Sequence, residues 1–180
     1  MDIVNLADVF ATAAHAAVKQ TRKYTGEPYI NHPREVRRIL LNFSTTPVTL
    51  EQEASALLHD VVEDTGVELS LIAETFGDRV AVLVEALTDV SKPEHGNRKV
   101  RKQMDLEHTA AGPIAAKNIK IADLISNSHS IVANDPDFAR VYLHEKTRIL
   151  EVCADADAGL LAEAYRVLND SKNQLCPKSK

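Results

Sequence analysis

The short stretch LLHDVVEDT, residues 57–65, sets chemically active side chains at helical spacing. At about 100° per residue, its aliphatic residues fill one side of a helix, while His59, Asp60, Glu63 and Asp64 fill the other. Imidazole and carboxylate groups exchange protons and bind metal ions. No Lys or Arg stands four residues from these carboxylates, so the polar side repels itself, and a bound cation would relieve that repulsion. The alternative interpretation is the solvated face of an amphipathic helix.

Two other places carry polar residues that call for partners. The segment 113–133 is apolar nearly all round, which predicts a buried helix, and Asp123 and Asn127 lie one turn apart within it. His32 stands in YINHP, at a junction between a loop and a helix, where a lone histidine is more often a surface or capping residue. Helical bundles build metal sites from imidazole and carboxylate groups of different helices, so these positions are candidates for one site.

The elements that must position these residues are helices. The chain has 180 residues, 44% of them hydrophobic and only 4% aromatic, a composition that favours helices packed on helices in one domain. Hydrophobic spacing and turn residues predict helices at 6–17, 34–43, 49–65, 69–76, 78–90, 98–111, 113–133, 138–153 and 158–170. Thr49 with Gln52 resembles a capping box. We expect a single all-α domain over residues 1–170 and a frayed tail over 171–180.

Charge and composition limit the kinds of partner that the protein can have. The formal net charge is −5, which gives no reason to expect bulk attraction to nucleic acid or to an anionic membrane. There is no basic secretory leader and no run of about 18 apolar residues. The two cysteines have neither a metal nor a redox spacing, which indicates a reduced, cytoplasmic protein. The sequence leaves open whether the chain forms a homo-oligomer.

Five segments together resemble a known family. In order they read RKYTGEPYINHP, LLHDVVEDT, FGDRVAVLVEALTDV, RKVRK and KIADLISN. They are similar to the hydrolase domain of RelA/SpoT-type enzymes and to the free-standing small alarmone hydrolases, within the HD-domain phosphohydrolases. The resemblance covers about residues 5 to 150. The HDVVED box with GEPYINHP upstream is specific to this group, whereas a bare HD dipeptide would be weak.

The resemblance implies an all-α HD-domain bundle that holds one metal ion, Mn²⁺, with Fe²⁺ or another divalent metal as alternatives. The ligands it implies are His32, His59, Asp60 and Asp123. It also implies that Glu63 and Asp64 orient or deprotonate a water molecule and manage the leaving group.

The substrate implied by the resemblance is a small nucleotide, guanosine 3′,5′-bis(diphosphate) or its triphosphate relative, which loses its 3′-pyrophosphate. Such an anion needs a local basic rim, for which the alternative is a solvated basic face. The implied substrate-binding residues are Arg22, Lys23, Asn127, Arg98, Lys99, Arg101 and Lys102. Tyr29 is expected to pack the loop before His32, and His15 to be an ordinary histidine.

The sequence departs from the family after Asp123, where Leu124 replaces a Lys and Ser128–His129 stands where an Arg is usual. These changes bear on base recognition and on the polyphosphate. Two alternatives therefore stand beside the guanosine substrate. One is a phosphohydrolase of another nucleotide, such as an adenosine alarmone or a 2′- or 3′-phosphorylated cofactor. The other is a non-catalytic HD module that senses a nucleotide.

Overall fold

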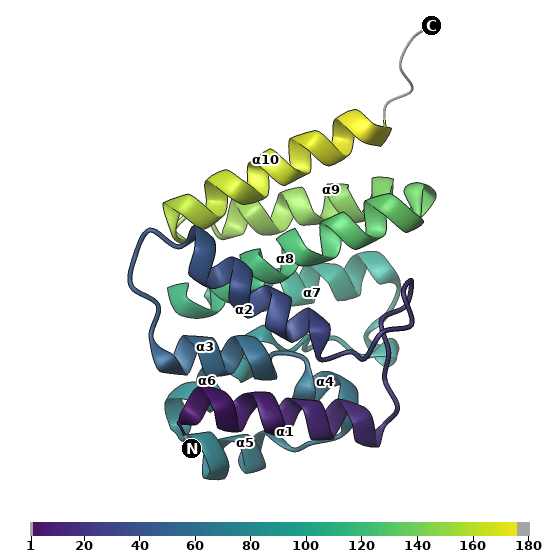
Figure 1. Ribbon diagram of the computed structural model, residues 1–180. Coiled ribbons are helices and arrows are strands. Elements are labelled where there is room, and N and C mark those ends of the chain that lie inside the picture. The colour runs from purple at the N-terminus through teal and green to yellow at the C-terminus, as the bar shows by residue number, and fades with distance from the viewer. Residues whose placement is uncertain (1, 176–180) are drawn as a thin grey trace, which may run out of the picture.

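The computed structural model describes residues 2–175, and within them it contains ten α-helices, one 3-10 helix and no β-strand (Figure 1). The α-helices are α1 (Ile3–Ala17), α2 (Asn31–Phe43), α3 (Leu50–Leu58), α4 (Val61–Thr65), α5 (Leu69–Phe76), α6 (Asp78–Leu87), α7 (Arg98–Ala111), α8 (Ile114–Asn134), α9 (Pro136–Val152) and α10 (Ala158–Leu175). The predicted all-α fold is confirmed. No helix of the described residues is both long and apolar enough to cross a membrane.

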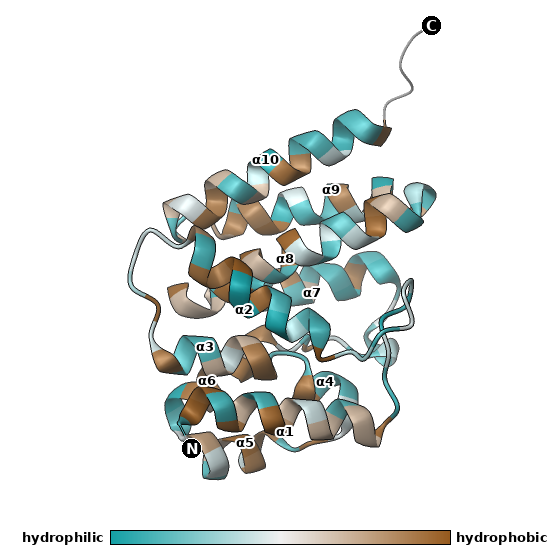
Figure 2. Ribbon diagram, viewed as in Figure 1, coloured by the Kyte–Doolittle hydropathy of each residue, from teal (hydrophilic) through white to brown (hydrophobic). Residues whose placement is uncertain are grey.

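The helices form two halves with separate hydrophobic clusters. The upper half in Figure 1 holds α8, α9 and α10, and the lower half holds α1, α3 and α5. One cluster draws its buried residues mainly from α2, α6, α8, α9 and α10, and the other mainly from α1, α3, α5 and α6. The helices are amphipathic, as the mixed hydropathy along each ribbon shows (Figure 2). Helix α3 contributes Ala56 to the first cluster and Leu57 and Leu58 to the second, so its C-terminus lies where the two meet.

Local signals explain several helix boundaries. Thr49 and Gln52 form the predicted capping box: the Thr49 side chain accepts from the Gln52 backbone, and the Gln52 side chain from the Thr49 backbone. Gly66 and Gly77, at φ 74° and 87°, follow the ends of α4 and α5 in a backbone region that favours glycine. Most of α8 is buried, as its continuous apolar sequence predicts.

The predicted continuous helix over 49–65 is wrong. Helix α3 ends at Leu58, α4 begins at Val61, and Asp60 between them has φ −99° and ψ −3°. Adjacent side chains on a regular helix point about 100° apart. The break lets His59 and Asp60 reach the same point, with His59 Nε2 and Asp60 Oδ2 3.0 Å apart. Neither proline nor glycine marks this break in the sequence.

The expected frayed tail from residue 171 also needs correction. Helix α10 continues to Leu175, and Ser171 is buried within it. The remainder of the expected tail lies outside the described residues.

Candidate active site

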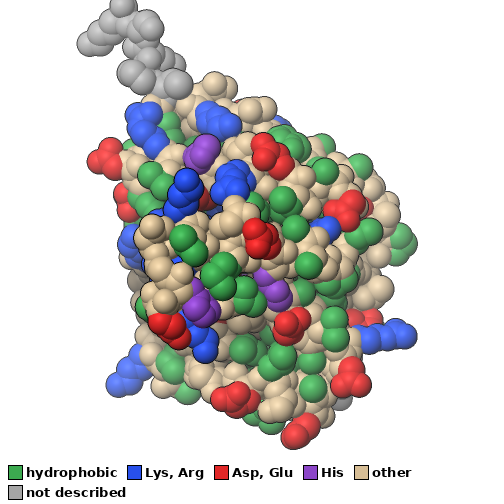
Figure 3. Space-filling view, turned by 180° about the vertical axis from the view of Figure 1, so that it is seen from behind, with side chains coloured by type: hydrophobic (Ala, Val, Ile, Leu, Met, Phe, Trp, Pro, Cys, Tyr) green, Lys and Arg blue, Asp and Glu red, His purple; other side chains and the backbone are tan. Residues whose placement is uncertain are grey.

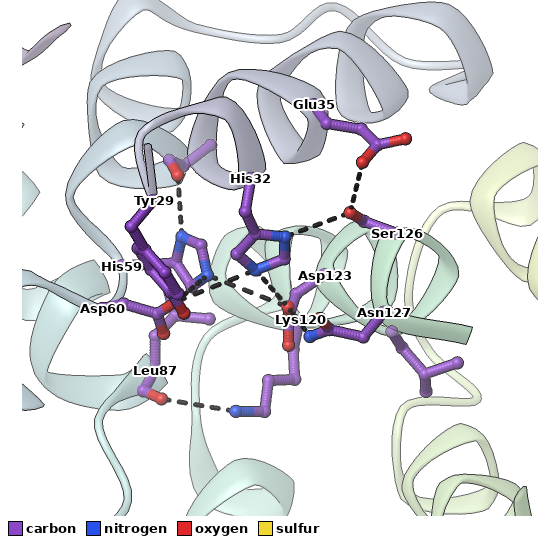
Figure 4. A network of polar contacts seen from close by, with 12 residues as sticks. Tyr29, His32, Glu35, His59, Asp60, Leu87, Lys120, Asp123, Ser126 and Asn127 are labelled. Carbon is purple, nitrogen blue, oxygen red and sulfur yellow. Dashed lines mark hydrogen bonds and ion pairs between the residues drawn. The ribbon is translucent and has the colours of Figure 1, made fainter. Parts of the chain in front are cut away.

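Three separate segments bring the predicted metal ligands together (Figure 4). His32 is the second residue of α2, His59 and Asp60 form the turn between α3 and α4, and Asp123 lies midway along α8. The two imidazoles are almost completely buried, at 2% and 3% exposure, and Asp123 is 7% exposed. Residues separated by up to 91 positions in the chain therefore meet where the two hydrophobic clusters join.

The distances within this group fit one metal ion. His32 Nε2 lies 3.0 Å from Asp123 Oδ1 and 3.7 Å from Asp60 Oδ2. His59 Nε2 lies 3.0 Å from Asp60 Oδ2 and 3.8 Å from Asp123 Oδ1. Both Nε2 atoms are buried and have no hydrogen-bond partner within residues 2–175. Ligands about 2.0–2.2 Å from a shared metal lie about 3–4 Å from one another. His32, His59 and Asp123 therefore form a group that can hold a divalent metal, with Asp60 beside it.

Hydrogen bonds on the far side of each imidazole leave Nε2 free to be a ligand. His59 Nδ1 lies 2.9 Å from the Ala56 carbonyl oxygen, which only accepts, so Nδ1 carries the proton. His32 Nδ1 lies 3.1 Å from Ser126 Oγ, and the Ser126 hydroxyl in turn donates to Glu35 Oε2 at 2.8 Å. Since that hydroxyl proton is used on Glu35, Ser126 accepts from His32 Nδ1–H. Partners of this kind fix the ring orientation of metal-binding histidines.

The electrostatics of the group favour a positive charge at its centre. Burial favours the neutral carboxyl of Asp123, yet His32 and His59 hold its pKa well below the usual range. Burial likewise opposes a charge on His59, but Asp60 and Asp123 raise its pKa to about 9. The carboxylates therefore stay ionised and attract a proton or a metal cation.

Tyr29 belongs to this site, a contact beyond the packing of the loop that the sequence led us to expect. Its hydroxyl donates to Asp60 Oδ2 at 2.6 Å, and its ring meets the His32 ring edge-on with 5.7 Å between centroids. Because Tyr29 stands three residues before His32, the turn that begins α2 brings both side chains to the site. In the sequence, only its place within GEPYINHP hints at this contact.

The two carboxylates proposed for proton transfer lie on α4, directly after the metal group. The Asp89 backbone N–H donates to Glu63 at 3.2 Å, and the Gln20 side-chain amide donates to Asp64 at 2.8 Å. Partial burial raises the pKa of both carboxyls, the charge of Asp89 raises the pKa of Glu63 further, and the charge of Asp60 adds to the rise in both. Carboxyls with raised pKa values exchange protons more readily near neutral pH.

A cleft in which cationic side chains outnumber acidic ones adjoins Glu63. Its main cavity, 310 Å³ between α7, α8 and α9, shares Asp89, Arg98 and Lys102 with a 230 Å³ cavity beside Glu63. It also shares Ile131 with a 180 Å³ cavity at the loop after α1. Basic residues from two distant segments therefore line adjoining cavities, as the sequence led us to expect for a bound polyphosphate.

The predicted basic residues of α7 divide into two groups. Arg98, Arg101 and Lys102 line the cavity beside Glu63, where Lys102 pairs with Asp89 at 2.8 Å. Arg98 is paired with Glu145, whereas Arg101 Nε is buried without a hydrogen-bond partner.

Lys99 does not join them. It lines another depression with His144 and Arg148, between α7 and α9, which meets the main cavity at Arg148. On the face opposite to Figure 1, Lys and Arg side chains gather toward the upper left (Figure 3). Arg98, Arg101 and Lys102 are three and four residues apart and share one face of α7. Lys99 directly follows Arg98 and points about 100° away from it.

At the other end of the cleft, Arg22, Lys23 and Asn127 line the 180 Å³ cavity together. Arg22 reaches Asn127 Oδ1 through long contacts of 3.4 and 3.5 Å. Asn127 donates to Asp123 Oδ1 at 2.6 Å, so it connects the cavity to the metal group. Lys23 is exposed and pairs with Asp135 at 3.6 Å.

Sequence reasoning missed two lysines that lie deep in the cleft. Lys120 stands one turn before Asp123 on α8; burial opposes its charge, but Asp123 and Asp89 raise its pKa. Lys146 on α9 lines the main cavity, and burial, with Lys120 and Lys102 nearby, lowers its pKa to about 8. The positive charge of Lys120 on α8 therefore partly offsets the repulsion among the carboxylates. The sequence signal was weak, since lysines on amphipathic helices are usually solvated.

The residues that depart from the family pattern face away from the cleft. Leu124 and Ser128 are buried in the core, and the Ser128 hydroxyl donates to the Leu124 carbonyl at 2.7 Å. His129 is exposed. None of the three lines the cavities described above.

Similarity to known proteins defines the class. Residues 7–158 match the family model of the HD domain, and the chain belongs to that family. The family resemblance predicted from the HDVVED box is confirmed.

Within the family, the chain is similar to the protein named guanosine-3′,5′-bis(diphosphate) 3′-pyrophosphohydrolase MESH1. It is 40% identical to the Mus musculus protein over 64% of this chain and 63% of that one. It is 35% identical to the Drosophila melanogaster protein, covering 69% of this chain and 68% of that one. A probable enzyme of the same activity from Synechocystis is 32% identical over 81% of this chain, which spans only 19% of that protein.

Solved structures agree with this placement. A metazoan ortholog of SpoT, described as hydrolysing ppGpp, superposes with a TM-score of 0.82 at 26% identity, covering 94% of this chain and 96% of that one. A Listeria monocytogenes protein superposes with a TM-score of 0.64 at 26% identity, covering 82% of this chain and 99% of its own.

Proposed function

We propose that this chain is a metal-dependent hydrolase that removes the 3′-pyrophosphate of guanosine 3′,5′-bis(diphosphate) or its triphosphate relative. The observation that carries the proposal is the meeting of His32, His59, Asp60 and Asp123 beside a cation-lined cleft. The names of the MESH1 relatives and the reported activity of the SpoT ortholog support the same reaction.

Mn²⁺ is the metal we propose, held by the four residues just named. Two imidazoles and two carboxylates form a borderline-hard donor set that suits Mn²⁺ or Fe²⁺. When bound, such a metal lowers the pKa of water and polarises a phosphoryl oxygen. The buried Nε2 atoms of His32 and His59, which lack hydrogen-bond partners, support this assignment.

Glu63 and Asp64 supply the proton transfers in this proposal. A water oxygen attacks the phosphorus that is bonded to the ribose 3′-oxygen. The bond between that phosphorus and the 3′-oxygen breaks, which yields pyrophosphate and a 3′-hydroxyl. One group, ionised as a carboxylate, takes the proton that the water loses, and the other, protonated as a carboxylic acid, gives its proton to the departing 3′-oxygen. The raised pKa values of both carboxyls suit this exchange.

The cleft supplies charge for the substrate phosphates. Lys102, Arg101 and Lys146 line its cavities, so an overall acidic protein offers a local cationic surface to a polyanion. Arg22, Lys23 and Asn127 would hold the nucleotide at the far end. Since the cavities adjoin, one extended nucleotide can reach both groups.

The test is a panel of nucleotides with pyrophosphate and phosphate release measured separately, with and without Mn²⁺. The panel includes the guanosine and adenosine 3′,5′-bis(diphosphates) and a 2′-phosphorylated cofactor, and Asp60→Ala is the control for metal-dependent turnover. We expect Mn²⁺-dependent pyrophosphate release from the guanosine compound and none from Asp60→Ala. Phosphate release from the other nucleotides alone would replace this proposal with a broader phosphohydrolase. Nucleotide binding without any hydrolysis would indicate a sensing module.

A further inference from the structure

Asp64 receives a hydrogen bond from outside its own helix. The Gln20 side chain, 44 residues earlier in the chain, donates from Nε2 to Asp64 Oδ2 at 2.8 Å. Helix α4 has only five residues, and the Asp64 residue is exposed. Among the described residues, no other side-chain hydrogen bond to this carboxylate is found. Its orientation therefore depends on Gln20.

His15 determines which way the Gln20 amide faces. His15 Nδ1 lies 2.6 Å from Gln20 Oε1, so the imidazole donates to the amide oxygen and leaves the amide nitrogen to donate to Asp64. A reversed amide would set its oxygen against the carboxylate. His15 is 1% exposed and its ring packs on Tyr29 with 4.7 Å between centroids, so it cannot turn away freely.

The end of α1 is shaped to bring Gln20 over His15. The Gln20 backbone N–H donates to the His15 carbonyl at 3.0 Å, and the Lys19 N–H donates to the Ala16 carbonyl at 3.0 Å. This is the Schellman arrangement, in which the residue after the cap is usually glycine. Here it is Lys19 at φ 55°, a left-handed conformation that non-glycine residues rarely adopt.

The His15 side chain is thus in contact with the supports of two functional carboxylates. Through Gln20 it reaches Asp64, and it packs on Tyr29, whose hydroxyl donates to Asp60. His15 lies in the last turn of α1, and Gln20 and Tyr29 lie in the segment between α1 and α2.

We propose that His15 and Gln20 are positioning residues that hold the Asp64 carboxylate in its reactive orientation. This inference rests on the proposed function, in which Asp64 transfers a proton. Proton transfer requires the groups to lie within about 2.6–3.2 Å, and a displacement of about 1 Å can lower a rate about 100-fold. A carboxylate on a five-residue helix needs such a support.

The test is a double-mutant cycle with Gln20→Ala, Asp64→Asn and the double variant, in Mn²⁺-loaded protein hydrolysing guanosine 3′,5′-bis(diphosphate). We expect Gln20→Ala to lower kcat about 10–100-fold with KM and bound Mn²⁺ unchanged. In the Asp64→Asn background the same substitution should change kcat less than about twofold, because the group it positions is already disabled. Equal effects in both backgrounds would overturn the proposal.

Three further variants separate positioning from folding. His15→Asn keeps a donor near the Nδ1 position and should retain more activity than His15→Leu, which has none. Lys19→Gly, which keeps the same backbone conformation, should match wild type in rate. If Gln20→Ala matches an active wild type, the positioning role fails and the proposed function stands. If wild type releases no pyrophosphate from any nucleotide, the proposed function itself fails.

Discussion

The hydroxyl of Tyr29 provides a sharp test of the metal group, because Tyr29→Phe removes one oxygen atom and keeps the ring. Burial and the Asp60 charge raise the pKa of Tyr29, so its hydroxyl stays protonated and always donates. The bond to Asp60 Oδ2 is 2.6 Å long, and hydrogen bonds to charged groups contribute about 1.5–3 kcal/mol. At about 1.4 kcal/mol per factor of ten, its loss corresponds to about 10–150-fold in an equilibrium constant.

Metal affinity is the quantity that should change. Loss of a hydrogen bond that orients a metal ligand typically weakens metal binding about 10–100-fold, which agrees with the range above. We therefore expect the Kd for Mn²⁺ to rise about 10–100-fold in Tyr29→Phe, measured by calorimetric titration of the metal-free protein.

A matched control lies in the same loop. Tyr24 donates to Asp135 at 3.0 Å, away from the metal group, so Tyr24→Phe removes an equivalent bond. It should bind Mn²⁺ as wild type does. A Tyr29→Phe protein that binds Mn²⁺ within about threefold of wild type would refute the reasoning that Asp60 is a ligand held by Tyr29.

Three other predictions follow from the cleft. Glu63→Gln should keep bound Mn²⁺ while lowering kcat about 10²–10⁴-fold, and loss of metal together with rate would make Glu63 a structural residue or a ligand. Lys146, with a pKa of about 8, is cationic below that pH and neutral above it, so kcat/KM should fall as pH rises past about 8, and Lys146→Met should flatten that limb. Arg101→Ala should raise KM more at low salt than at high salt, whereas Lys99→Ala, which faces another depression, should match wild type. If both alanine variants have wild-type kinetics at low salt, these basic residues do not bind the substrate.

The sequence predicted the helices and the polar residues of the metal group for simple physical reasons. Asp123 stood out because a carboxylate in a helix that is apolar all round must have a partner. His59 stood out because its neighbours were acidic and unpaired along the helix. The position of Asp60 beside His59 could be expected only from the family resemblance and not from helical spacing, since it depends on a helix break without proline or glycine.

The supporting residues were harder to predict because their roles arise only in the folded chain. The contact of Gln20 with Asp64 depends on Lys19 adopting a conformation that the sequence would assign to glycine. In the sequence, Lys146 resembles any charged residue on an amphipathic helix. Only the packing of α7 and α8 beside α9 places it in the cleft. Lys99 and Arg101 cannot be separated by composition, and only their directions on α7 place one in the cleft and one outside it.

The metal group stands at the seam between the two hydrophobic clusters, with His32 of α2 and Asp123 of α8 on the side of the first cluster and the α3–α4 turn on the side of the second. An ion held there works as a non-covalent crosslink between the halves of the bundle. By linkage, a ligand at 100 times its Kd adds about 2.7 kcal/mol to the free energy of unfolding, a large share of the stability of an ordinary domain. Loss of the ion would therefore lower the stability of the fold as well as the activity. The metal-free chain would be cleaved more easily by proteases.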